Sequence, residues 1–97
     1  MRFEWDPEKA RSNQAKHGIT FDEARTLFTG GVDYLEIYDT EHSTDEDRFI
    51  AIGAVERGVI CVAFTELDED HIRIISSRLA TRRERQLLSR HIGKAGS

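Results

Sequence analysis

Hydrophobic and polar positions alternate with two different periods along this chain, and the changes of period mark the expected elements. Met1–Trp5 predicts a short strand. Asp6 and Pro7 are suited to the N-cap and first position of a helix that should run to about His17. Gly18 then offers a left-handed stop. The chain is therefore expected to begin with a strand and a helix.

A second helix should follow directly. Thr20–Glu23 reads TFDE, which has the spacing of a capping box. The side chains with helical spacing toward the core are Phe21, Ala24, Leu27 and Phe28. The pair Gly30-Gly31 is expected to end this helix.

The middle of the chain has the pattern of strands. The segment VDYLEIYD, beginning at Val32, alternates between apolar and acidic residues. The segments RFIAIGAV and VICVAFTE are apolar at nearly every position, so both of their faces are expected to be covered. Between them, Glu56–Gly58 is typical of a hairpin turn. The segment HIRIISSR alternates again, with Ile72 and Ile74 inward and Arg73 outward.

The last helix has its own start signal. Thr81–Glu84 is a second capping box, and Leu87, Leu88 and Ile92 form an apolar stripe behind it. The predicted order is strand, two helices, four strands, helix. Hairpin connections make the sheet mainly antiparallel, which predicts an α+β fold. Residues 1–92 are expected to form a single domain, and residues 93–97 a loose C-terminal tail.

Composition narrows the class of protein. Hydrophobic residues make up 38% of the 97 residues, which is enough for one modest core. The single cysteine, Cys61, excludes an internal disulfide, and its apolar strand predicts a core position. A lone cysteine suits a reducing cytosol, so a cytoplasmic protein is expected. The N-terminus has no apolar signal core, and no apolar run approaches a membrane span.

Charge is distributed unevenly. The formal net charge is −4, yet Asp33–Asp47 holds seven acids and no lysine or arginine. His71–Ser97 holds seven lysines and arginines and one acid, Glu84. A polyanion would feel this basic field within a Debye length, about 8 Å at physiological salt. The alternative is a solvated surface of mixed charge.

The segment IRIISSRLATRRER places its arginines around the start of the last helix. The helix dipole disfavours cations there, whereas guanidinium groups beside a helix N-terminus form a suitable phosphate site. The competing interpretation is that these arginines pair with the acidic segment 33–47 across the fold. Arg78, at a strand end, could pair inside while Arg82 and Arg85 reach outward.

Metal and nucleotide motifs are absent. No two of the four histidines have the spacing of a helical metal site, and one cysteine excludes a zinc ribbon. His42 lies among Asp39, Glu41 and Asp45, which could hold a divalent cation, but a solvated acidic loop is favoured. There is no glycine-rich phosphate loop and no G-x-S-x-G motif. No metal and no cofactor are expected.

Three separated blocks carry a resemblance. FEWDPEKARSNQAKHGITFDEA, DTEHSTDEDRFIAIG and IRIISSRLATRRER, in this order, resemble the BrnT family of type II toxin–antitoxin toxins, whose fold is similar to RelE-like ribonucleases. The resemblance runs from Phe3 to about Leu88. There are two departures. The family usually has ISAR where this chain has Ser76-Ser77-Arg78, and a tyrosine near the position of Leu88.

The resemblance implies a toxin that cleaves RNA and stops translation. It also implies a BrnA-like antitoxin with a DNA-binding ribbon-helix-helix part, so that operator DNA is bound only through the antitoxin. The competing class is a non-enzymatic partner that acts with such an antitoxin as a transcriptional co-repressor.

Metal-free RNA cleavage requires three things. The 2′-OH loses a proton, the phosphorane charge is stabilised, and the leaving oxygen gains a proton. Arginine suits the second task, and the candidates are Arg48, Arg78 and Arg82. The candidates for proton transfer are His17, His42 and Glu84, which the sequence does not distinguish. The expected RNA-binding side chains are Lys16, Arg73, Arg82, Arg83 and Arg85.

Overall fold

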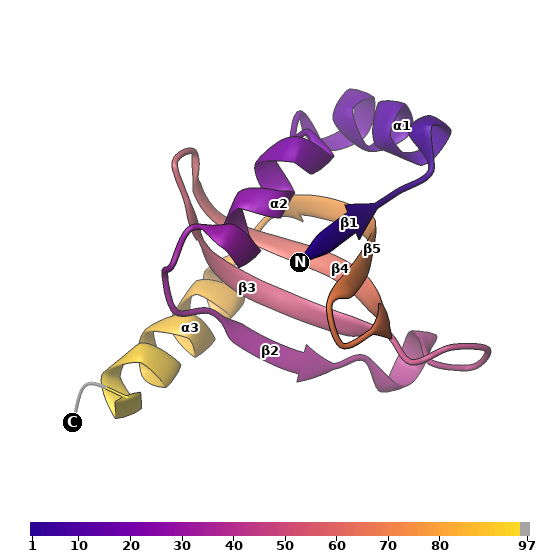
Figure 1. The fold of residues 1–97 in the computed structure, drawn as a ribbon. Helices are drawn as coiled ribbons and strands as arrows, with labels where there is room; N and C mark the ends of the chain where they lie inside the picture. The colour runs from indigo at the N-terminus through magenta and orange to yellow at the C-terminus, as the bar shows by residue number, and fades with distance from the viewer. Residues whose placement is uncertain (96–97) are drawn as a thin grey trace.

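Five strands and three helices make up the computed structural model, which describes residues 1–95 (Figure 1). In chain order the elements are β1 (Arg2–Glu4), α1 (Pro7–His17), α2 (Phe21–Thr29), β2 (Leu35–Tyr38), the short 3₁₀ helix η1 (Thr40–His42), β3 (Phe49–Val55), β4 (Gly58–Asp68), β5 (His71–Leu79) and α3 (Arg82–Ala95). The strands form one sheet in the order β1-β5-β4-β3-β2.

The helix caps follow the sequence signals. Asp6 accepts a hydrogen bond from the Glu8 amide at 2.9 Å, and Gly18 ends α1 with a φ of 72°. Thr20 and Glu23 form the capping box of α2 through reciprocal side-chain and backbone hydrogen bonds. These local predictions are confirmed, because each cap requires only residues within one turn of the helix.

The pairing of β5 sets the geometry of the site. β4 pairs with β5 and β3, and β3 with β2, all antiparallel, whereas β1 pairs with β5 in parallel over His71–Arg73. The prediction of a mainly antiparallel α+β fold is confirmed, with one parallel edge. Along β5, Ser76 pairs with Ala63 but Ile74 pairs with Phe64, so Ile75 is an extra residue at a bulge.

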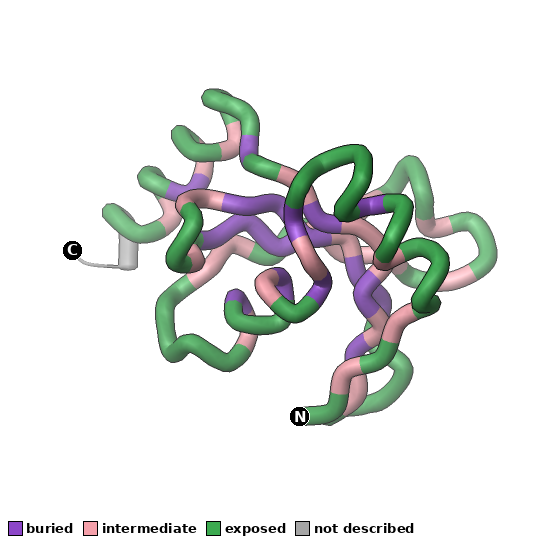
Figure 2. The backbone as a smooth tube through the Cα atoms, turned by 90° about the horizontal axis from the view of Figure 1, so that it is seen from above, coloured by how far each residue is buried: buried purple, intermediate pink, exposed green. Residues whose placement is uncertain are grey.

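Two hydrophobic clusters lie on opposite faces of this sheet. α1 and α2 cover the first face, where β4 contributes its alternate residues Ile60, Val62 and Phe64. α3 contacts β2 and β3 on the second face, over a smaller cluster. The buried members of that cluster are Ile52, Cys61, Ala80 and Leu88. Burial is concentrated in the middle of the sheet, while loops and outer helix faces are exposed (Figure 2). Consecutive residues are buried in the middle of β3 and β4, at 51–53 and 60–62, so both faces are covered there as expected; on the second face, Ile50 and Ala63 are only half-buried.

Two boundaries differ from the sequence prediction. The strand expected from Val32 begins at Leu35, because Gly31 turns the chain with a φ of 73° and leaves Val32 50% exposed. The expected loose tail is helical as far as Ala95, and residues 96–97 lie outside the described part. Gly93 does not adopt the positive φ of a helix stop, and its cost within a helix is only about 1 kcal/mol relative to alanine.

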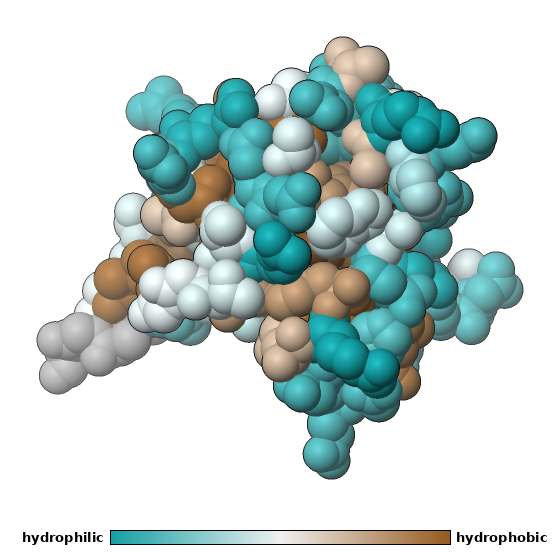
Figure 3. Space-filling model, turned by 45° about the horizontal axis from the view of Figure 1, so that its top comes forward, coloured by the Kyte–Doolittle hydropathy of each residue, from teal (hydrophilic) through white to brown (hydrophobic). Residues whose placement is uncertain are grey.

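The surface is mainly hydrophilic, as the 33% content of charged residues leads one to expect. Hydrophilic side chains dominate the side of the molecule seen in Figure 3, and hydrophobic ones show only in patches between them. Among the helices of residues 1–95, none is long and apolar enough to cross a membrane.

Candidate active site

A cavity of about 210 Å³ occupies the open part of the second sheet face. Ile50, Cys61 and Ala63 from β3 and β4 supply apolar lining. The polar lining residues are Asp39 and His42 at η1, Arg48 just before β3, and Ser76 and Arg78 of β5. Apolar lining with a few convergent polar groups is the usual composition of a ligand site.

His42 is held by a carboxylate at this cavity. Its Nδ1 lies 2.9 Å from Oδ2 of Asp39, whose side chain is only 13% exposed. An ionised carboxylate can only accept, so Nδ1 carries the hydrogen and the neutral ring keeps its lone pair on Nε2. The Asp39 amide also donates to the Arg48 carbonyl at 2.9 Å, which ties the turn to the start of β3. The imidazole is therefore oriented as a proton acceptor.

A carboxylate also holds Arg78, the guanidinium group that lines this cavity. Its Nη1 and Nη2 donate to the two carboxylate oxygens of Glu84 at 2.8 and 2.9 Å. The Thr81 amide donates to Glu84 at 2.8 Å, and the Glu84 amide to the Thr81 hydroxyl at 3.2 Å, which confirms the predicted capping box. The carboxylate thus joins the end of β5 to the first turn of α3.

The same contacts determine how Glu84 titrates. Hydrogen bonds from Arg78, with smaller contributions from Thr81, lower the pKa of the Glu84 carboxyl to about 2 against the opposing effect of burial. A carboxyl with such a pKa stays ionised at neutral pH and has no proton to deliver. Glu84, a sequence candidate for proton transfer, is placed instead to position Arg78.

Cys61 lies against this ion pair. Its Sγ is 3.6 Å from Oε2 of Glu84, and burial, with the Glu84 charge, raises the pKa of the thiol to about 12. The thiol is buried and stays protonated, so the predicted core position is confirmed and a nucleophilic role is disfavoured.

Two further arginines share Glu46 of the acidic segment. Nη2 of Arg73 donates to both carboxylate oxygens at 2.7 and 2.6 Å, and Nε of Arg48 lies 3.9 Å from Oε1. Nε of Arg48 is buried and has no hydrogen-bond partner within the described residues. Among the arginines of IRIISSRLATRRER, the interpretation that they pair with segment 33–47 is correct for Arg73, whereas Arg78 pairs with Glu84 instead. The acid that Arg73 meets was not singled out from the sequence.

Lys16 and His17 lie elsewhere. They line a separate hollow of about 210 Å³ beside α1, together with Lys9, Ser12 and Asn13. Both hollows reach Ile75 and Ser76, so they flank the same part of β5. Of the two histidine candidates, the structure brings His42 to Arg48 and Arg78, and it does not bring His17 there.

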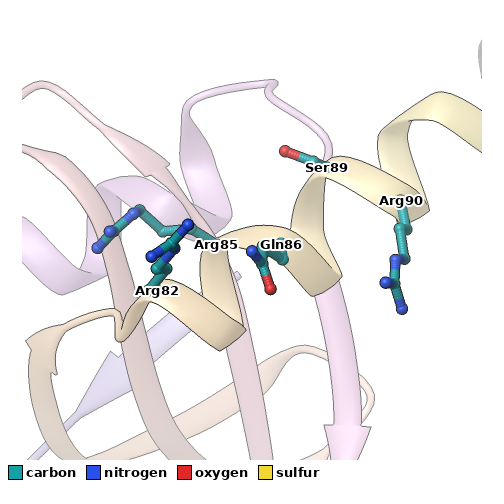
Figure 4. Close-up of a pocket in the computed structure, with 5 residues that line it drawn as sticks. All are labelled: Arg82, Arg85, Gln86, Ser89 and Arg90. Carbon is teal, nitrogen blue, oxygen red and sulfur yellow. The ribbon is translucent and has the colours of Figure 1, made fainter.

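The outer face of α3 carries the remaining arginines. Arg82, Arg85, Gln86, Ser89 and Arg90 line an open hollow of about 500 Å³ (Figure 4). Arg82, a sequence candidate for stabilising the phosphorane, thus lines this hollow and not the cavity, and exposed Arg83 lines neither. Arg90 was not among the sequence candidates, although Arg82, Gln86 and Arg90 occupy successive i, i+4 positions and therefore share one helix face.

Metal ligands do not converge in the part of the chain that the structure describes. No three side chains of His, Cys, Asp or Glu within it are placed to hold a metal ion. His42 contacts Asp39 alone among the acidic neighbours considered from the sequence.

Comparison with known families decides the classification. A family model described as the ribonuclease toxin BrnT of type II toxin–antitoxin systems matches residues 5–84. The chain belongs to the BrnT family. The crystal structure of the ribonuclease toxin BrnT from Brucella abortus is similar, with a TM-score of 0.61 and 26% sequence identity. This match covers 84% of the present chain and 99% of the Brucella chain. A search of curated proteins finds no match.

The BrnT match includes the whole cavity and ends in the first turn of α3, at Glu84. Leu88, where a BrnT tyrosine is usual, is 5% exposed and packs in the cluster beneath α3. Leu88 does not line the cavity, but it belongs to the same cluster as Cys61, which does.

Proposed function

We propose that this BrnT-family chain is an endoribonuclease that inhibits translation by cleaving RNA without a metal. The observation that carries the proposal is the convergence of an oriented imidazole, His42, and a carboxylate-held guanidinium, Arg78, on one cavity. Family membership supplies the reaction class, and the cavity supplies groups suited to it.

The cleavage proceeds by attack of the ribose 2′-oxygen on the adjacent phosphorus. Nε2 of His42 takes the 2′-OH proton, the new O–P bond forms, and the bond to the 5′-oxygen breaks. The imidazolium then returns the proton to the leaving 5′-oxygen, which leaves a 2′,3′-cyclic phosphate and a 5′-hydroxyl. Asp39 stabilises the imidazolium through Nδ1.

Arg78 stabilises the charge of the phosphorane. Glu84 and the Leu79 carbonyl accept from Nη1 and Nη2 of Arg78, and the Nε–H and the second Nη2–H remain to bind phosphate oxygens. Because the guanidinium is fixed before substrate binds, it needs no reorganisation during the reaction. Arg48, at the other side of the cavity, is the second candidate for this task.

Substitution of Arg78 tests the assignment. Arg78→Ala should reduce the single-turnover rate with saturating enzyme by about 100-fold or more, the usual effect of losing one donor to a developing oxyanion. Arg83→Ala, on an exposed position outside the cavity, should weaken RNA binding and leave that rate unchanged. Thermal melting of both variants checks the fold. Normal cleavage by a folded Arg78→Ala enzyme would move the stabilisation of the phosphorane to Arg48.

We further propose that a BrnA-like ribbon-helix-helix antitoxin neutralises the enzyme in the cytoplasm, and that operator DNA is bound only through that antitoxin. Expression of the chain alone should stop growth and degrade RNA, and co-expression of the antitoxin should reverse both effects. A chain that leaves RNA intact but increases operator binding by the antitoxin would be a co-repressor and not an enzyme.

A further inference from the structure

Within the described part of the chain, the arginines of α3 differ from all other arginines because no carboxylate lies within ion-pair distance of them. Within residues 1–95, every arginine outside α3 has a carboxylate oxygen 3.9 Å or less from its guanidinium group. None of Arg82, Arg83, Arg85 and Arg90 has one there, although the chain contains 18 acidic residues. Nη1 of Arg85 donates to the Ala80 carbonyl at 3.1 Å, which is a neutral acceptor. The positive charge of α3 is therefore not neutralised within the described fold.

Three of these four arginines share one face. Arg82, Arg85 and Arg90 line the hollow of about 500 Å³ together with Gln86 and Ser89. Figure 4 shows Arg82 and Arg85 extending from the first turns of α3, with Arg90 farther along the helix. Two guanidinium groups that line one hollow with no acid between them repel each other, and an anion bound there would relieve this repulsion. We call this face the α3 track.

The track begins at the N-terminus of α3, the end of the helix that is joined to the cavity wall. Glu84 in the first turn holds Arg78, which lines the cavity, although the track lies on roughly the opposite face of the helix from Glu84. Arg82 and Arg90 are eight residues apart, or about 12 Å along the helix axis at 1.5 Å per residue. A stacked strand advances about 3.4 Å per nucleotide, so the track matches three to four nucleotides. An RNA strand that leaves the cavity reaches this face by passing around the N-terminus of α3.

The side chains also fit RNA better than an acidic peptide. Arginine binds phosphate oxygens through two parallel hydrogen bonds and stacks on unpaired bases. Gln86 and Ser89, between the arginines, can both donate and accept, which suits ribose hydroxyls and base edges more than carboxylates. The family match ends at Glu84, so the track lies largely beyond the region that carries the cavity.

We infer that the α3 track binds the RNA strand that flanks the cleaved bond, so that the substrate is single-stranded RNA long enough to occupy both the cavity and α3. This inference rests on the proposed nuclease function. It separates two tasks: cavity residues cleave, and the track sets affinity and substrate length.

A charge-matched pair of triple variants tests the inference. The first is Arg82→Gln, Arg85→Gln and Arg90→Gln. The control is Arg2→Gln, Arg11→Gln and Arg25→Gln, which removes the same charge from exposed ion pairs elsewhere. Binding of an unstructured 2′-O-methyl oligonucleotide of about 20 nucleotides is measured by fluorescence anisotropy over a range of salt concentrations. Cleavage of the matching RNA and of a dinucleotide is measured in parallel.

Each phosphate contact to a single strand contributes about 0.7 to the slope of log K against log salt concentration. The track variant, which loses three contacts, should therefore show a slope smaller by about 2 and bind the oligonucleotide about 50-fold more weakly at 0.15 M salt. Its kcat/KM on the dinucleotide and its rate on saturating long RNA should stay within about twofold of the wild type, because no cavity group has changed. The control variant should resemble the wild type in all measurements.

A track variant that keeps the wild-type affinity and salt slope would overturn the inference. If that variant also fails to bind the antitoxin, the track belongs to the antitoxin and not to RNA. Failure of the wild type to cleave either substrate would contradict the proposed function instead, and the binding measurements would still decide whether the track holds RNA.

Discussion

One buried hydroxyl inside the sheet, that of Ser77, is expected to lower the free energy of unfolding. Ser77, which stands where BrnT sequences usually have alanine, is fully buried, and its hydroxyl has no hydrogen-bond partner within the described residues. Ser77→Ala should raise the free energy of unfolding by about 1 kcal/mol, because it removes a buried polar group that is not bonded. Urea unfolding measures the change. Ser76→Ala, at a half-buried neighbour, is the control, and a loss of stability in Ser77→Ala would mean that the hydroxyl is bonded.

Glu84 predicts a pH dependence of stability. Its pKa of about 2 in the folded protein lies below the ordinary value of 4.5, mainly because Arg78 donates to it. The folded state therefore binds the proton less readily, and this stabilisation is complete above about pH 4.5 and disappears as the pH falls toward 2. We expect at most about 3 kcal/mol from this group, since its side chain is 18% exposed. Urea unfolding of the wild type and of Glu84→Gln from pH 2 to 7 measures this contribution to stability. If both proteins lose stability equally as the pH falls, the lowered pKa of Glu84 is contradicted.

At the scale of elements, one side chain fastens α1 to the sheet. Nδ2 of Asn13 donates to the carbonyls of Ile19 and Ser77 at 3.0 and 2.8 Å, and its Oδ1 accepts from the Ser77 amide at 2.9 Å. The side chain thus replaces a neighbouring strand where β5 extends beyond β1. This contact keeps α1 next to β5 and closes part of an exposed sheet edge.

Asn13→Ala should lower the free energy of unfolding by about 3 kcal/mol, because it leaves several buried backbone groups without partners. Hydrogen exchange of the Ser77 amide should become faster in the same variant. Gln14→Ala, an exposed position on the same helix, should change neither quantity. Unchanged exchange at Ser77 in the Asn13 variant would show that water or another residue replaces the amide.

At the scale of the whole molecule, both hydrophobic clusters depend on the same strands. Ile60 and Val62 pack beneath α1 and α2, and Cys61 between them packs beneath α3. Neither cluster can be lost without opening β4, so we expect residues 1–92 to unfold in one cooperative transition. Calorimetric and van't Hoff enthalpies should agree. Separate transitions monitored at Trp5 and at a probe on α3 would contradict this.

The tertiary arrangement also explains which site residues could be predicted. His42 and Arg78, which the structure brings to one cavity, were both candidates from the sequence because their residue types suit RNA cleavage. Asp39, which orients His42, and Glu46, which pairs with Arg73, were not assigned these roles. An acidic loop is usually solvated, and nothing local distinguishes one acid from the next. His17 was an equal candidate until the fold placed it beside α1 and not in the cavity.

The sequence by itself determined the helix starts, the order of elements along the chain and the family, since caps, turns and motifs depend on residues close together in the chain. It could not determine which charges meet. Arg73 and Glu46 are separated by 27 residues and come together only when the loop before β3 is brought to β5. Tertiary structure alone therefore decided which arginines are neutralised inside the fold and which, on α3, remain available to an anion.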